Sequence, residues 1–436
     1  MNKNLFKLSL WLLCIGWVAT ACDDDSDGQA QYEYTTEDGS YNFVLKGYGH
    51  EQFSYGDNVL KPFDLEAPIY IENTSLSGRA YSYAKVQAER LDEVAEVPAD
   101  GYESVAPIVE NALYVARFSD IYKNVYLKLR IVRVEGSEVT LEYALLKQEV
   151  SPNENANQPV DGDTSVMEFE MPRRNVANAY APHKVTVDGE EVLNLAIEWN
   201  DAMKHAQWVA FSFNKVTGWD NGVGRADKVI SGFVWPEDEL LPENMRVGES
   251  SHKKDGFDKG HLCASEDRQY LQAANIQTFY YSNMSPQMGS FNGGIWMKLE
   301  ALVQSWGYSV SKGGFDNVYI AKGGTLNKLL KGFTGTKKGG DGLYPKTDDN
   351  GFTTHGLACP AYYFMAIMAE KGGQYQTIAF LLPHNETLSS SADLKEFVVT
   401  IDKLEEETGN DFFCNLPDTI EDEIEASVDM NLWTWD

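Results

Sequence analysis

A polar segment at residues 151–165 divides the chain, and this division is what most limits the folds open to it. The segment contains Pro152 and Pro159 and almost no apolar side chain, which is the composition of an interdomain linker. At 436 residues the chain is also long for one domain, since domains typically have about 100–200 residues. We therefore predict two folded units, one on each side of a linker at 151–165.

The first unit, residues 32–150, is predicted to be a small all-β domain. Short runs rich in β-branched and aromatic residues alternate there with glycine, proline and Asp or Asn turns, a pattern typical of sandwiches and barrels. The clearest strand-like runs are Tyr41–Leu45, Ala67–Ile71, Val125–Val134 and Val139–Leu146. The unit contains no recognisable catalytic motif, so the sequence predicts no function for it.

The second unit, residues 166–436, is predicted to be an α+β domain because strand and helix patterns intermix along it. Strands are expected at Lys184–Val187, Trp208–Phe213, Val318–Ala321 and Thr377–Leu382. Helices are expected at Ile295–Trp306, with Asn292 as the N-cap, and at Asp393–Thr408.

Residues 1–21 have the pattern of a secretory signal peptide. Lysines at positions 3 and 7 precede the apolar run Leu8–Val18, which is shorter than the roughly 18–20 residues that span a bilayer. Small residues then lead to Cys22, and this junction resembles a bacterial lipobox, which implies lipid attachment at Cys22. Plain secretion with an incidental cysteine is the alternative.

Residues 22–31 are expected to form an acidic tether behind the lipid. The run Asp23-Asp-Asp-Ser-Asp27 resembles the signal that routes lipoproteins to the outer membrane or cell surface of some Gram-negative bacteria. A simple solvated spacer explains the same residues. We expect an exported protein whose contact with the membrane is the anchor at Cys22, and we expect no protein partner.

The net charge of −30 argues against a polyanionic partner, since a surface of that sign repels nucleic acid. The charge is unevenly distributed, however. Residues 23–165 hold 27 acidic and 11 basic residues, and residues 411–436 hold eight acidic residues and no basic one. Much of the excess therefore lies outside the motifs described below, which weakens the objection without removing it.

Three cysteines remain after the leader: Cys263, Cys359 and Cys414. Their spacing fits no zinc motif. In an exported protein an odd number is compatible with one disulfide plus one free thiol, and equally with three buried free thiols.

A glycine-flanked histidine, His261, lies in the polar stretch 256–268, and an amide-rich segment at 278–287 then leads to Asn292. A histidine with a pKa near 6.5 can take a proton from an attacking water at physiological pH. On the predicted helix Asn292 and Glu300 lie about two turns apart on roughly one side. An amide oxygen and a carboxylate so placed suit a hydrated cation such as Mg²⁺, and Mn²⁺ accepts the same ligands.

Three motifs together resemble the DNA/RNA non-specific endonuclease family of the ββα-metal superfamily. They are Asp258-Lys-Gly-His261, Asn283-Met-Ser-Pro-Gln287 and Asn292-x-Gly-x-Trp-x-x-Leu-Glu300, and the resemblance extends over roughly 185–436. It implies a ββα-metal nuclease domain with a mixed sheet and flanking helices. It also implies a Mg²⁺-dependent, or Mn²⁺-dependent, enzyme that hydrolyses DNA and RNA phosphodiesters with little sequence specificity.

The resemblance also implies roles for single residues. His261 would be the general base, Asn292 the direct metal ligand, and Glu300 the residue that orders metal-bound water. Alone, each has an ordinary structural explanation, and it is their joint occurrence that favours catalysis. Lys259 and Asn283 are expected beside His261 and Glu300 among the catalytic residues, and substrate contacts are expected from Asp258, Gln287 and Arg225.

Two positions depart from the family pattern. Lys259 stands where the family usually has arginine, so a charge is kept but the bidentate fork is lost. Gln304 stands where a further arginine is common. We expect slower turnover. The alternative is a catalytically weak or inactive surface lipoprotein that uses the nuclease fold or the β domain for binding.

Overall fold

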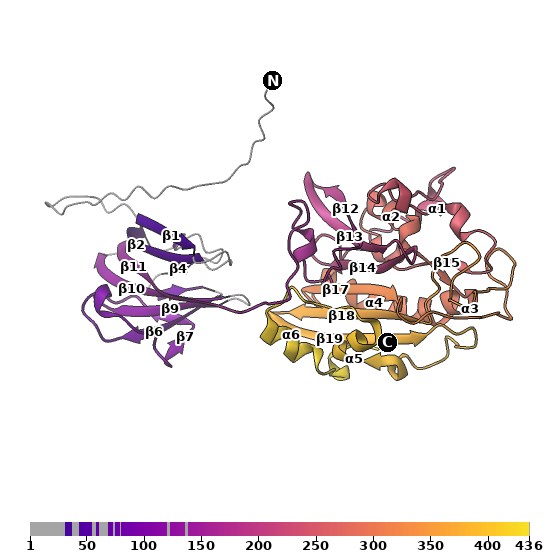
Figure 1. The fold of residues 1–436 in the computed structure, drawn as a ribbon. Helices are drawn as coiled ribbons and strands as arrows, with labels where there is room; N and C mark the ends of the chain where they lie inside the picture. The colour runs from indigo at the N-terminus through magenta and orange to yellow at the C-terminus, as the bar shows by residue number, and fades with distance from the viewer. Residues whose placement is uncertain are drawn as a thin grey trace, which may run out of the picture. The chain divides into compact units, whose positions relative to one another are not determined.

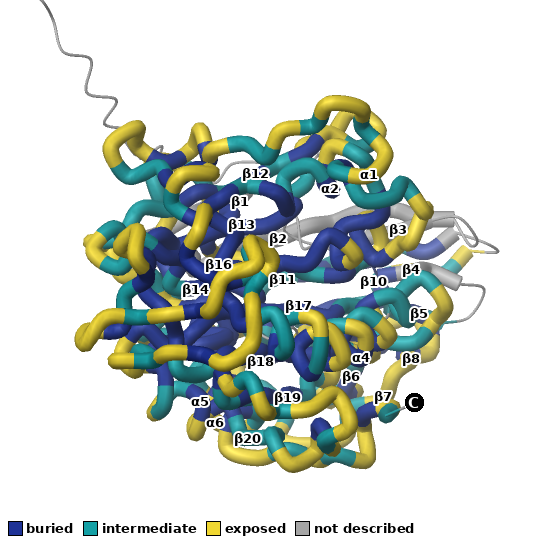
Figure 2. Tube along the Cα trace, turned by 90° about the vertical axis from the view of Figure 1, so that its right-hand side faces the viewer, coloured by how far each residue is buried: buried dark blue, intermediate teal, exposed yellow. Residues whose placement is uncertain are grey.

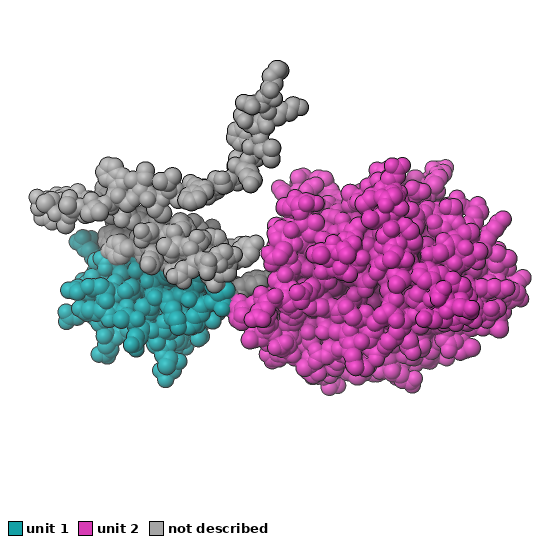
Figure 3. Space-filling model, viewed as in Figure 1, with its two compact units in different colours: residues 1–150 teal, residues 151–436 magenta. Residues whose placement is uncertain are grey.

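The computed structural model describes residues 31–435 except 37–42, 55–57, 61–68, 73–74, 79, 120–122 and 136–137. The predicted signal peptide, nearly all of the acidic tether and Cys22 lie outside the described residues. The chain divides into two compact units, residues 1–150 and 151–436, which Figure 3 colours separately. No helix in the described part of the chain is long and apolar enough to cross a membrane.

The described part of the first unit consists of two antiparallel sheets and one short 3-10 turn, Leu91–Glu93. The larger sheet has the order β1-β2-β11-β10-β9-β6-β7 and the smaller has β3-β4-β5-β8. Their bounds are β1 Gln31–Thr36, β2 Phe43–Ser54, β3 Asn58–Leu60, β4 Ile69–Glu72, β5 Ser75–Ser77, β6 Tyr81–Val86, β7 Tyr102–Glu103, β8 Val105–Pro107, β9 Leu113–Ser119, β10 Lys123–Glu135 and β11 Glu138–Val150.

Alternation of apolar residues explains the core of this unit. Along β10, Leu127, Leu129 and Ile131 are fully buried, and on β11 Leu141 and Tyr143 are buried on the same face. A strand places alternate side chains on one face, so these residues pack into one cluster. The predicted runs Val125–Val134 and Val139–Leu146 fall within β10 and β11. Parts of Tyr41–Leu45 and Ala67–Ile71 lie outside the described residues.

The second unit contains a seven-stranded sheet in the order β12-β13-β14-β17-β18-β19-β20 (Figure 1). The bounds are β12 Ala179–Val187, β13 Glu190–Asn200, β14 His205–Phe213, β17 Asn317–Gly324, β18 Tyr362–Lys371, β19 Gln374–Pro383 and β20 Val398–Val399. Helices accompany it, so the α+β prediction is confirmed. Every strand pair in this sheet is antiparallel, so the prediction of a mixed sheet is wrong. Several neighbours are joined by tight hairpins, which need no crossover helix.

The central strands of this sheet are buried along almost their whole length, as Figure 2 shows for the tube along β14, β17 and β18. Strands covered on both faces show continuous burial where half-exposed strands show alternation. The α-helices are α1 Ala226–Val229, α2 Gln272–Gln277, α3 Gly289–Phe291, α4 Met297–Gly307, α5 Ile401–Thr408 and α6 Asp418–Glu425. α4 contacts β17, whereas α5 and α6 contact β19.

The single helix predicted at Asp393–Thr408 is wrong. The segment forms a 3-10 turn at Leu394–Phe397, then the edge strand β20, then α5. Two capping side chains explain the break: Asp393 accepts from the backbone of Lys395, and Thr400 accepts from that of Lys403. Each cap begins a separate helical turn. Between the two turns, the β-branched residues Val398 and Val399 form β20, which pairs with β19.

Residues 151–165 pack as part of the second unit, which differs from the linker that the composition predicts. The Asn153 side chain donates to the backbone oxygens of Cys414 (3.1 Å) and Leu416 (2.5 Å). Asn157 is buried, and its backbone donates to Asn415 Oδ1 at 3.0 Å. Asparagines that composition alone marks as solvated are here satisfied by hydrogen bonds within the fold.

Cys263, Cys359 and Cys414 are all buried and all free. The sequence left two alternatives, and the structure agrees with the second one, three buried free thiols.

A buried ion pair ties three elements together. Lys322 on β17 lies 2.7 Å from Asp267, and both side chains are fully buried. Asp267, in the 3-10 turn Ser265–Arg268, also accepts from the backbone of Ala264 (2.8 Å) and from Gln304 Nε2 on α4 (3.0 Å). Both oxygens of the Asp267 carboxylate therefore have partners, and these interactions offset the free-energy cost of burying its charge.

Removal of Lys322 should therefore destabilise the second unit strongly. We expect Lys322→Ala to lower its free energy of unfolding by about 3–5 kcal/mol, because Asp267 becomes an uncompensated buried charge. Urea denaturation followed by tryptophan fluorescence measures this, since every tryptophan after the leader lies in the second unit. The exposed Lys331→Ala is the matched control. A loss below about 1 kcal/mol would contradict the expectation.

Candidate functional site

A two-stranded hairpin followed by a helix carries the motifs. β15 (Asp258–His261) pairs antiparallel with β16 (Met284–Gln287), so that His261 lies opposite Met284 and Asp258 opposite Gln287. Gly260 is required here, because a Cβ at this position would lie only 2.0 Å from Gln287 Oε1. The glycine of the Lys-Gly-His motif is thus explained by close packing of the hairpin.

Buried hydrogen bonds hold this hairpin to the large sheet. His205 on β14 donates from Nδ1 to the Ala206 oxygen (2.7 Å), so its Nε2 accepts from Ser285 Oγ (2.5 Å). The Tyr363 hydroxyl on β18 lies 2.6 Å from the same Ser285 Oγ and 2.8 Å from the Pro286 oxygen. Burial lowers the pKa of His205 to about 4, so the ring stays neutral as this pattern requires.

The helix after the hairpin begins earlier than predicted and contains a kink. α3 leads into a wide turn at Asn292–Trp296 that is broken at Gly294 (φ −119°, ψ −109°), and α4 follows directly. Asn292 has helical backbone angles (φ −55°, ψ −57°), so the prediction that it is an N-cap is wrong. His384 Nε2 accepts from the Met288 backbone at 2.8 Å and anchors the start of this segment. Wide turns of this kind are frequent at functional sites.

Asp258 orients the Asn292 amide. Asn292 Nδ2 donates to Asp258 Oδ2 at 3.4 Å, and Asp258 Oδ1 accepts from the Gly340 backbone at 2.6 Å. The Asn292 amide oxygen accepts no hydrogen bond from the described part of the chain. Asp258, expected as a substrate contact, thus serves to position Asn292, because its negative charge would repel a phosphate.

A cavity of about 490 Å³ brings most of the predicted site residues together. Its lining includes Arg225, Lys259, His261, Asn292 and Glu300. An adjoining cavity of about 420 Å³ contains Asp258 and shares Trp235, Lys259 and Asn292 with the first. Asn283 and Gln287 line neither cavity and are fully buried.

His261 lies against aromatic rings at the wall of the cavity. Its ring meets Trp235 and Phe279 edge-on, at centroid distances of 5.5 and 5.1 Å. Its Nε2 is out of contact with solvent and has no hydrogen-bond partner among the described residues. Burial, assisted by the nearby charge of Arg225, lowers the pKa of His261 to about 3. The ring is therefore neutral over the whole physiological range and can accept a proton.

Asn283 holds the backbone that follows His261. Its Nδ2 donates to the oxygens of Cys263 (2.8 Å) and Thr278 (2.7 Å), and its Oδ1 accepts from the Cys263 backbone at 2.9 Å. Expected among the catalytic residues, Asn283 does not reach the cavity and acts as a positioning residue. Gln287, expected to contact substrate, packs against Gly260 instead.

Two cations face the cavity. Lys259 Nζ lies 3.9 Å from the centroid of the Trp235 ring, and burial lowers the pKa of this lysine. The Arg225 guanidinium stacks over Phe279 and donates to Asp227 Oδ1 at 3.1 Å. Arg225, expected as a substrate contact, therefore lines the same cavity as His261 and Lys259.

Glu300 presents a carboxylate oxygen that needs a partner. Oε1 is buried and forms no hydrogen bond with the described residues. Burial raises the pKa of Glu300 to about 8, although the charge of Lys322 lowers it. Because Asn292 lines the same cavity with an amide oxygen that accepts no hydrogen bond, the two residues fit a hard cation that keeps several water ligands.

Sequence reasoning missed Trp235 and the pair Asp267–Lys322. The sequence did contain a signal for the ion pair. Lys322 follows the apolar run Val318–Ala321 directly, and a charged residue in a buried strand usually has a partner. Trp235 gave no signal, because it lies in an irregular segment without periodicity.

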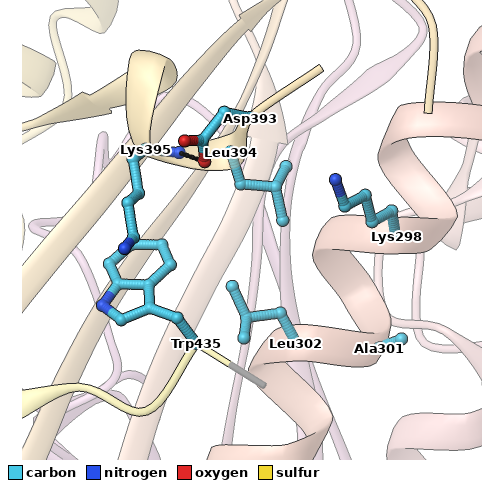
Figure 4. A pocket seen from close by; sticks show the side chains of 7 residues that line it. All are labelled: Lys298, Ala301, Leu302, Asp393, Leu394, Lys395 and Trp435. Atoms are coloured by element: carbon cyan, nitrogen blue, oxygen red, sulfur yellow. Dashed lines mark hydrogen bonds between the residues drawn. The ribbon is translucent and has the colours of Figure 1, made fainter. Parts of the chain in front are cut away.

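A third cavity, of about 400 Å³, borders the site on another side of α4 (Figure 4). Ala301 lines both this cavity and the one that contains His261. Lys395 Nζ lies 5.0 Å from the Trp435 ring centroid, and Lys298 Nζ donates to the Ala392 oxygen at 2.8 Å. None of the predicted site residues faces this cavity.

Comparisons with known proteins match the part of the chain that contains these site residues. The model of the DNA/RNA non-specific endonuclease family matches residues 176–419, more than half of the chain. A nuclease of Nostoc sp. is 29% identical over 57% of this chain and 82% of its own length. Nuclease C1 of Cunninghamella echinulata is 33% identical over 47% of this chain and 78% of its own.

A solved structure, the EndoG/EndoGI complex, aligns with 54% of this chain and 87% of its own at 20% identity, with a TM-score of 0.41. These values are too low for a detailed structural comparison. The match of the family model and the identity to nuclease C1 are sufficient by themselves. The chain belongs to the DNA/RNA non-specific endonuclease family and is a phosphodiester hydrolase.

Proposed function

We propose that this enzyme is a metal-dependent endonuclease that hydrolyses phosphodiester bonds of both DNA and RNA with little sequence preference. One observation carries the proposal: the imidazole of His261, whose Nε2 is buried, and the amide of Asn292 line the same cavity. A general base and a cation ligand must converge on one phosphate for this chemistry. The family match supports the nucleic acid substrates.

Mg²⁺ is the proposed cofactor, and Mn²⁺ accepts the same oxygen ligands. Asn292 would hold the ion directly and Glu300 through a water molecule. When bound, the ion neutralises charge on the phosphate and stabilises the leaving oxygen. The orphaned Oε1 of Glu300 and the orientation of Asn292 by Asp258 support this assignment.

His261 would take the proton of the attacking water. The rings of Trp235 and Phe279 meet the imidazole edge-on and fix its position, and because Nε2 is closed off from solvent, Nδ1 would be the nitrogen that receives this proton. Lys259 and Arg225 would hold the phosphate oxygens, because both cations face the same cavity. Asn283 keeps the backbone after His261 in place.

We also propose that the enzyme is exported and anchored by lipid at Cys22, at the outer membrane or cell surface of a Gram-negative bacterium. The support is the order of features in residues 1–31: lysines, an apolar run, a small residue before Cys22 and an acidic stretch. Nucleic acid outside the cell would then be the substrate.

Replacement of His261 by alanine should abolish most cleavage without unfolding the protein. We expect a rate loss of about 10²–10⁴-fold, the usual contribution of a general base. Digestion of DNA and RNA in Mg²⁺, with EDTA as the blank, measures it, and thermal unfolding reports folding. The exposed His355→Ala is the matched control and should retain activity. A wild type inactive in every metal tested would favour a binding protein instead.

The pH at which activity falls by half on the acid side should lie far below the ordinary pKa of histidine. Burial lowers the pKa of His261, so the neutral base persists as the pH falls and is lost only near pH 3. Because kcat/KM reports groups of the free enzyme, its half-maximal point should lie well below pH 6. The profile is measured at saturating metal, since acid also weakens metal binding to carboxylates. An acid limb centred at or above pH 6.5 would refute this expectation.

Lys259→Arg should raise activity. A guanidinium can stack on Trp235 as the ammonium does and can also grip a phosphate with two parallel hydrogen bonds. We expect an increase in kcat/KM of about three- to tenfold, which corresponds to the net contribution of roughly one ordinary hydrogen bond. Lys253→Arg, at the edge of the adjoining cavity, is the control. If Lys259→Arg leaves kcat/KM unchanged, a bidentate phosphate contact at this position is excluded.

A further inference from the structure

A cluster of carboxylates lies between α5 and α6, far along the chain from the hairpin that carries His261. Asp402 and Glu405 are one turn apart on α5, and Glu425 is the last residue of α6. One oxygen from each lies within 4.8 Å of the other two. Both helices contact β19, beside which they are drawn in Figure 1.

Glu425 is the member of the cluster that lacks a partner. Its side chain is only 5% exposed, and its Oε1 forms no hydrogen bond with the described residues. Neither Asp402, Glu405 nor Glu425 is paired with a lysine, arginine or histidine in the described part of the chain. A buried carboxylate in this situation is costly unless a positive charge neutralises it.

The neighbours make the cluster more negative. Glu421 and Asp411 lie close enough to Glu425 to act on its charge. These two have partners of their own: Asn155 Nδ2 donates to Glu421 at 2.8 Å, and Arg173 lies 3.7 Å from Asp411. The Phe412 backbone donates to Glu405 Oε1 at 2.6 Å. Glu421, Asp411 and Glu405 thus each have a hydrogen-bond or charge partner, whereas none is found for the Glu425 carboxylate among the described residues.

Either a proton or a cation can relieve this repulsion. A divalent ion bound by the three carboxylates would neutralise the buried charge of Glu425, which no side chain pairs with among the described residues. Because Asp402 is exposed, water can complete the coordination from the solvent side.

We propose that Asp402, Glu405 and Glu425 form a structural binding site for a divalent cation of the Ca²⁺ type, which ties α5 to α6. All donors are oxygens, which excludes the thiolate and imidazole ligands typical of structural zinc sites. The three ligand oxygens lie within 4.8 Å of one another, close enough to share one ion. Carboxylates from two different helices suit Ca²⁺, which accepts irregular oxygen geometry, better than Mg²⁺, which demands a near-ideal octahedron.

The proposed site shares no residue with the cavity that contains Asn292, so a variant of one site leaves the other site intact. Thermal unfolding of the full chain at pH 7.5 is measured in EDTA and in millimolar CaCl₂. We expect Ca²⁺ to raise the Tm of the wild type by about 5 °C. Glu425→Gln should lose this rise, whereas Asn292→Ala should keep it. Glu423→Gln, the same change at an exposed position of α6, is the matched control and should also keep it.

Calorimetric titration with CaCl₂ gives the stoichiometry. We expect Glu425→Gln to remove one binding event that Asn292→Ala leaves in place. If Glu425→Gln fails to fold, the exposed Asp402→Asn replaces it. The proposal is overturned if Ca²⁺ leaves the wild-type Tm unchanged, which would mean that the cluster holds protons only. It is also overturned if Glu425→Gln responds to Ca²⁺ as the wild type does.

Discussion

The site depends on the buried hydrogen bonds that hold the β15–β16 hairpin on the seven-stranded sheet. Ser285 is held between His205 and Tyr363, which belong to two different strands of the sheet. Each of these polar groups would be costly to bury without a hydrogen-bond partner. All of them are satisfied together only when the hairpin occupies this position on the sheet. His261 at the end of β15 and Asn292 after β16 thereby face a common cavity.

Burial shifts the pKa values of the two key ionisable groups in opposite directions, and each shift favours the neutral form. A neutral His261 is favoured because the imidazolium would lose its hydration, and protonation of Glu300 is favoured because its carboxylate would. The neutral imidazole keeps a free lone pair for a proton. A cation bound beside Glu300 would act against the shift there, because a nearby positive charge favours the carboxylate.

The strongly acidic composition is compatible with a nucleic acid substrate because charge is arranged locally. Lys259 and Arg225 balance Glu266 and Glu300 in the lining of the cavity, whereas uncompensated carboxylates cluster elsewhere, as between α5 and α6. Repulsion between separated surface charges decays within a Debye length of about 8–10 Å. Two cations and a bound metal at the cavity therefore matter more to a phosphate than the charge of the whole chain.

Local patterns in the sequence were sufficient for the family, for the α+β class and for strands such as β10, β11, β14 and β17. They also associated His261 with Asn292 and Glu300, because motif spacing and strand-like runs are properties of short segments. Tertiary structure decided the rest. Only long-range contacts could show that Asn283 is bonded to Cys263, that Gln287 packs against Gly260, that Lys322 neutralises Asp267, and that residues 151–165 pack within the second unit. In each of these cases the partner is distant in sequence, so no local pattern could identify it.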